Sequence, residues 1–136
     1  MNRSFRAHGA ASFEIRGRVV VMQVRGPWNA ELVLQSHEAM HVALPELQGG
    51  RWAMLVVITG SAMFGPDVVE AIRNTVQNES ATMERVATAW VLGPEVEGAT
   101  LVPGVLRGLY GESDRFRIFE TVEPAEAWLN GKIEAA

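Results

Sequence analysis

The sequence predicts a single-domain α/β fold with a mixed, mostly parallel sheet. Short apolar runs of strand length alternate with segments that begin with helix-start signals, and this alternation continues along the whole chain. The expected order of elements is β-β-α-β-α-β-α-β-α. Such an order favours parallel strands joined by right-handed helical crossovers, with one antiparallel strand at the edge of the sheet.

The chain opens with two strand-like runs, residues 12–17 and 18–26, which read as an antiparallel hairpin. The second run is almost continuously apolar, and this predicts an internal strand that is covered on both faces. Asn29 is a favourable N-cap for the helix that follows, which is expected to run to about Leu47.

The remaining chain continues the alternation. Pro66 is expected in the first turn of the second helix, because a proline there loses no helical hydrogen bond. The expected elements are a buried strand at 52–59, a helix from Pro66 to about Ser80, a strand at 85–93, a short helix weakened by glycines at 101–111, a strand at 116–121 and a closing helix at 123–131.

The amino-acid composition of the chain excludes several classes of function. The chain has 136 residues, of which 48% are hydrophobic and 21% charged, with a net charge of -4. A nucleic-acid partner is not expected, because no basic stripe is present to neutralise phosphates. The absence of cysteine excludes disulfides and thiolate chemistry and favours a cytoplasmic location. Neither a signal peptide nor an apolar run long enough for a membrane span is recognisable.

The segment SHEAMH contains His37, Glu38 and His41 in the H-E-x-x-H order of zinc proteases. On a helix, His37 falls on the apolar stripe that should face the core, whereas Glu38 points towards solvent. A catalytic zinc site needs both histidines and the glutamate in one open cleft, together with a third protein ligand. We interpret the segment as a chance match and expect no metal, no cofactor and no catalytic residue.

Several stretches carry a specific resemblance: GPWN before the first helix, AWVLG in the strand at 85–93, and FRIFETVEPAEAWL at the end. Together with the order of elements, they resemble STAS-like domains related to the sporulation anti-sigma-factor antagonist, and within them an uncharacterised bacterial branch. The resemblance covers about residues 8–130, so residues 1–136 are expected to form a single domain.

The resemblance implies a phosphorylatable serine at the start of the helix after the third strand. This chain has FGPDVV there, and no serine stands in that stretch. Ser61, a few residues upstream, is the only displaced candidate that we considered. A serine between a strand and a helix is more often a turn or cap residue, and we interpret Ser61 in that way.

A binding site is expected at the loops that follow the carboxyl ends of the parallel strands. These loops are GPWN, TGSAMFG and GPEVEGATLVPG. Their candidate binding residues are Trp28, Asn29, Ser61, Met63 and Phe64.

Two function classes follow. The first is a non-enzymatic regulatory or protein-interaction module, which binds a protein partner or a second copy of itself, with Phe64 as the expected anchor. The alternative is a carrier of a small apolar ligand or lipid, because the β-α superhelix also resembles CRAL-TRIO domains. An apolar cavity of about 300 Å³ or more distinguishes a carrier from an interaction module.

Overall fold

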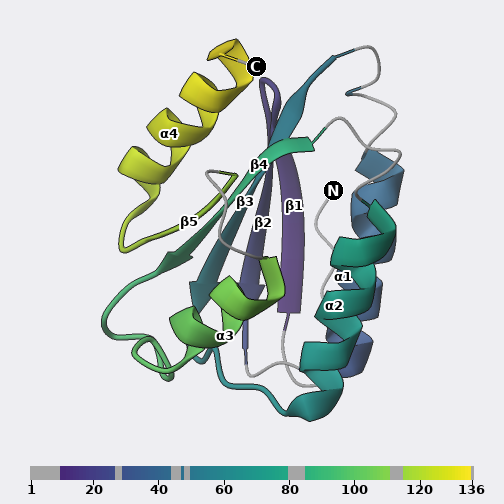
Figure 1. The fold of residues 1–136 in the computed structure, drawn as a ribbon, viewed down its shortest axis with the longest axis vertical. Coiled ribbons are helices and arrows are strands. Elements are labelled where there is room, and N and C mark those ends of the chain that lie inside the picture. Colours follow the sequence, from purple (N-terminus) through teal and green to yellow (C-terminus); the bar gives the residue numbers. More distant parts are fainter. Residues whose placement is uncertain are drawn as a thin grey trace.

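The computed structural model describes residues 10–26, 29–43, 47, 50–79, 85–110 and 115–135. It is an α/β structure, as predicted, in which strands and helices alternate after an opening hairpin (Figure 1). The elements are β1 (Ala10–Arg16), β2 (Val19–Arg25), α1 (Ala30–Ala43), β3 (Trp52–Thr59), α2 (Pro66–Glu79), β4 (Arg85–Leu92), α3 (Val102–Tyr110), β5 (Phe116–Phe119) and α4 (Val122–Ala135).

The five strands form one sheet in which the spatial order is the order along the chain, β1-β2-β3-β4-β5. Strand β1 pairs antiparallel with β2, and every later pair is parallel. The prediction of a mostly parallel sheet with one antiparallel edge strand is therefore confirmed. The hairpin turns at Gly17, whose φ of 61° is in the left-handed region that glycine adopts without strain.

Helices α1, α2 and α3 all pack on one face of this sheet. Their buried residues Val33, Val68 and Leu106 belong to the same apolar cluster as Met54 and Trp90 of the strands. The strand order explains this arrangement. Each parallel crossover steps to the next strand in the same direction, and crossovers of one hand that step in one direction place their helices on one face.

Helix α4 covers the opposite face, where Ala125 and Leu129 are fully buried against Leu55 and Ala89. Its Trp128 ring lies 5.8 Å from the Phe119 ring, centroid to centroid. Because the inner strands are covered on both faces, their apolar residues follow one another almost without interruption.

Strand β1 extends beyond the cover of α4 and therefore alternates in polarity. Phe13 and Ile15 pack against the cluster on the α1 side. Glu14 and Arg16 are exposed on the other side, where Arg16 Nη1 contacts Glu126 Oε1 of α4 at 2.6 Å. This ion pair joins the edge of the sheet to the rim of α4, and its exposure makes its contribution to stability small.

One helix end differs from the prediction, and a second cannot be compared with it. Helix α1 is described as far as Ala43, and residues 44–46, over which it was expected to continue to about Leu47, lie outside the described residues. Helix α4 continues past Gly131 to Ala135, because half-buried Ile133 prolongs its contact with the sheet.

The buried side of α1 includes Val33 and Ser36, and His37 is half-buried beside them. The side chains of Met40 and His41 lie outside the described part of the chain.

No described helix is both long enough and apolar enough to cross a lipid bilayer.

We predict that Gly131→Ala stabilises the fold by about 0.5–1 kcal/mol, because alanine has the higher helix propensity. A Cβ at Gly131 would meet no atom within 4 Å. Urea unfolding followed by circular dichroism measures the change. The control is Gly98→Ala, which should be destabilising because Gly98 has a φ of 88° and a Cβ there would lie 2.8 Å from Met63 Sδ. Equal effects of the two substitutions would contradict this account.

Candidate functional site

The loops after β2, β3 and β4 meet at the carboxyl edge of the parallel strands, as expected. The Gly26 N–H donates to the Thr59 carbonyl at 3.1 Å, which brings the chain after β2 against the end of β3. A Cβ on Gly60 would lie 3.4 Å from the Gly26 carbonyl oxygen, so the two loops are in close contact. The first two loops are therefore held together by backbone.

The loops after β3 and β4 are joined by a short extension of the parallel pairing. The Ala62 N–H donates to the Glu97 carbonyl at 2.8 Å, and the Glu97 N–H donates to the Gly60 carbonyl at 3.1 Å. Ser61 and Glu97 thus form an isolated parallel bridge beyond the ends of the strands. Two backbone hydrogen bonds fix the position of the chain that leads into α3.

Ser61 adds a side-chain link at the same place. It is 7% exposed, and its hydroxyl donates to Glu97 Oε1 at 2.6 Å. Ser61 Oγ also accepts the Met63 N–H at 3.2 Å, which closes a turn of the kind that serine favours. The Ser61 hydroxyl therefore donates one hydrogen bond and accepts another within the protein, and it stabilises the turn, in agreement with the interpretation from the sequence.

Met63 and Phe64 follow this turn and differ in exposure. The Met63 side chain is 39% exposed and lies over Gly98, where a Cβ would be 2.8 Å from its Sδ. Phe64 is half-buried and packs against the main apolar cluster. Of the two, Met63 presents more of its side chain to a partner, and Phe64 covers the end of the core.

The other two candidate residues lie at the start of α1. Asn29 directly precedes the helix, and its carbonyl accepts the Val33 N–H at 3.2 Å, the bond expected of a residue at the N-cap. Trp28 lies outside the described residues.

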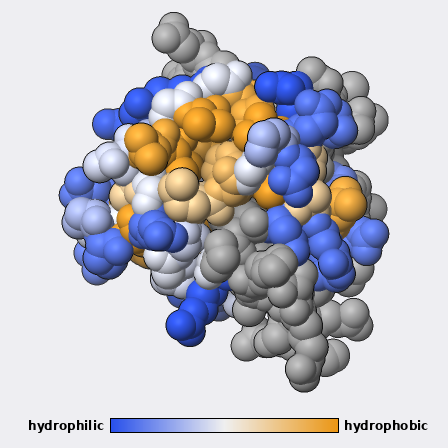
Figure 2. All heavy atoms as spheres, turned by 90° about the horizontal axis from the view of Figure 1, so that it is seen from below, coloured by the Kyte–Doolittle hydropathy of each residue, from blue (hydrophilic) through white to orange (hydrophobic). Residues whose placement is uncertain are grey.

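An apolar area occupies the face of the molecule towards which the parallel strands run, and polar residues border it (Figure 2). The large apolar side chains exposed at this end are Leu101 at 67%, Val105 at 40% and Met63 at 39%. We call these three residues the edge patch. Gly98 places Met63 beside the start of α3, since a Cβ on it would contact both Met63 and Val102.

Leu101 and Val105 were not among the binding residues predicted from the sequence. Residues 101 and 105 are one helical turn apart, about a quarter turn around α3 from buried Val102 and Leu106. The signal was the near absence of polar residues from the segment 101–109, which has apolar residues or glycine on both sides of the helix. A surface helix with one face in the core normally carries polar residues on the other.

Charged side chains flank the edge patch asymmetrically. Glu95 and Glu97 are exposed in the loop after β4, Asp67 is exposed in the first turn of α2, and Arg107 is exposed in the last turn of α3. Acidic residues thus lie on the loop side of the patch and a basic residue on the helix side.

The H-E-x-x-H segment lies on α1, away from this edge. Glu38 is exposed, His37 is half-buried, and the side chain of His41 is outside the described set. Within the described residues, no group of three or more His, Asp or Glu side chains could hold a metal ion.

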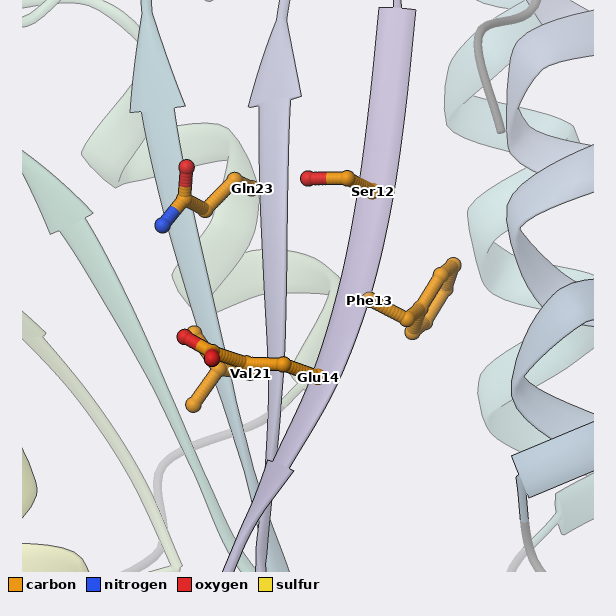
Figure 3. Close-up of a pocket in the computed structure, with 5 residues that line it drawn as sticks. All are labelled: Ser12, Phe13, Glu14, Val21 and Gln23. Atoms are coloured by element: carbon orange, nitrogen blue, oxygen red, sulfur yellow. The ribbon is translucent and has the colours of Figure 1, made fainter. Parts of the chain in front are cut away.

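A hollow of about 180 Å³ lies on the β1–β2 hairpin, on the side of the sheet that carries α4. Figure 3 shows Ser12, Glu14 and Gln23 directed to this side, whereas Phe13 points to the other. Its lining is largely polar, and its volume is below the roughly 300 Å³ typical of small-molecule pockets. It does not have the character expected of a site for an apolar ligand.

The chain matches no protein-family model and no curated protein.

We predict that Ser61→Ala lowers the free energy of unfolding by about 1 kcal/mol, because a partly buried hydroxyl-to-carboxylate bond is lost. Urea denaturation measures this change. Glu97→Gln keeps an acceptor for the hydroxyl and should cost less. A neutral Ser61→Ala variant would contradict the structural role, and so would phosphate mapped to Ser61 in the folded protein, because its hydroxyl is buried and hydrogen-bonded.

Proposed function

We propose that this chain is a non-enzymatic regulatory or protein-interaction module of STAS-like type, which binds its partner through the edge patch. The observation that carries the proposal is the exposure of Leu101, Val105 and Met63 together at the carboxyl edge of the sheet. Grouped apolar side chains on a surface are typical of protein interaction sites. In α/β sheets this edge is also the usual place for binding.

The rigidity of this edge favours recognition of a protein surface. The bonds that connect Ala62 and Glu97 hold the two loops, and the Met63 side chain is placed over Gly98. A surface that is ordered before binding loses less conformational entropy when a partner docks. The edge patch therefore needs little rearrangement to bind.

The start of α2 bears on how such a module would be regulated. Helix α2 begins at Pro66, and Asp67 provides an exposed carboxylate in its first turn. The resemblance to STAS-like domains implies a phosphorylated serine near this point. A fixed carboxylate at the positive end of the helix dipole is stabilising and does not depend on a kinase. We therefore propose that partner binding is independent of phosphorylation at this position.

The hollow among the described residues of the hairpin does not favour the carrier alternative. An apolar ligand needs a cavity lined by apolar side chains, whereas the hollow on the hairpin is lined in part by Ser12, Glu14 and Gln23.

We predict that Leu101→Asp weakens partner binding roughly 30-fold, since apolar side chains at the centre of an interface contribute about 2 kcal/mol. Leu34→Asp is the matched control, because Leu34 is 54% exposed on α1 and outside the edge patch. Both tagged variants are compared with the wild type for proteins that copurify from the source cells and for affinity to those proteins.

Partners lost with Leu101→Asp and kept with Leu34→Asp are the expected result. The proposal is wrong if both variants keep the same partners. A stoichiometric apolar small molecule, seen by native mass spectrometry of the purified chain, would instead favour the carrier.

A further inference from the structure

We infer that the partner of the edge patch is a second copy of this chain, docked with its α3 antiparallel to the first α3. This inference rests on the proposed function, because it names the occupant of the same surface. It follows from the shape of α3 and from the arrangement of charges around it.

One side of α3 is apolar, uncharged and free of bulky side chains at two points. Leu101, Gly104, Val105 and Gly108 are exposed and follow the spacing of a single helix face. A Cβ at Gly104 or Gly108 would meet nothing within 4 Å. Glycine at such positions allows the backbone of another element to come close. The exposed Leu101 and Val105 side chains then supply the apolar contact.

The charges around α3 fit another α3 in the antiparallel direction. Glu95 and Glu97 precede the helix, and Arg107 lies in its last turn. With the twofold axis near Gly104 and Val105, Arg107 of each copy faces the start of the other helix, where the acidic loop lies. Each copy therefore contributes both members of a charge pair, and the pair forms twice.

Within the described part of the chain, Arg107 and Glu95 take part in no ion pair. Glu97, in contrast, already accepts a hydrogen bond from Ser61. A parallel arrangement of the two helices would instead bring Arg107 beside its own copy. The antiparallel pair is thus the one that the charge pattern favours.

A nine-residue helix and one loop give a small interface. We therefore expect a dimer that forms at high protein concentration and dissociates on dilution.

The first experiment uses the absence of cysteine from the chain. Val105→Cys introduces a single thiol beside the expected twofold axis, where the two copies of position 105 come within disulfide reach. Mild oxidation should produce a covalent dimer of Val105→Cys within minutes. The control is Leu34→Cys, which places an equally accessible thiol on α1 and should remain monomeric.

The second experiment uses charge reversal, followed by sedimentation equilibrium. Arg107→Glu and Glu95→Arg should each weaken self-association at least fivefold. In an equimolar mixture each heterodimer regains two opposite-charge pairs, so association should return to the wild-type level. Circular dichroism confirms that both variants are folded.

Each outcome bears on the inference. A chain that stays monomeric at millimolar concentration overturns it, as does a mixture that associates no better than either variant alone. Leu101→Asp separates the two proposals. If it abolishes capture of another protein while the wild type is monomeric, the proposed function stands and the self-docking is wrong. If it leaves a wild-type dimer intact, self-association occurs through a different surface and the inference is wrong.

Discussion

The order of the strands determines on which face the helices lie and where the loops meet. Because β2, β3, β4 and β5 lie side by side in chain order, each parallel crossover repeats the step before it. Three helices are thereby placed on one face, and α4 covers the other face over only part of its width. The same repetition brings the loops after β2, β3 and β4 to one edge. The position of the candidate site is thus a consequence of topology.

At that edge the polar groups form hydrogen bonds within the protein, whereas several apolar side chains are exposed. Backbone N–H and carbonyl groups and the Ser61 hydroxyl form hydrogen bonds between the loops, and these bonds hold the loops together. The side chains of Met63, Leu101 and Val105 are left at the surface. A loop region that was free to rearrange could bury such side chains against the core. Here the backbone pairing prevents it, and association with another surface remains the way to remove them from water.

Much of the fold could be predicted from the sequence because continuous apolar runs such as Val19–Met22 and Trp52–Ile58 fit only covered strands. Pro66 and Asn29 likewise marked helix starts through local chemistry, which needs no tertiary context. The end of α4 was missed because Gly131 is a local stop signal, whereas the packing of Ile133 is a tertiary one.

The position of the candidate site could be predicted from the sequence, but the residues that form its surface could not. The meeting of the loops follows from parallel strands, whereas the exposure of each side chain depends on the path of the loop between them. Phe64 was the expected anchor because it is a large aromatic residue in the loop before the second helix, and its side chain is half-buried against the core. Leu101 and Val105 went unselected because an apolar residue next to a helix is ordinarily assigned to the buried face, and α3 is apolar on both sides.

If the loops after β3 and β4 form one fixed surface, amide hydrogen exchange of the folded chain shows it most directly. The amides of Ala62 and Glu97 donate to carbonyls across the two loops. The account predicts that both exchange slowly, at rates close to those of amides in the middle of β3. Exchange of these two amides as fast as that of unprotected loop amides, with β3 still protected, would contradict it.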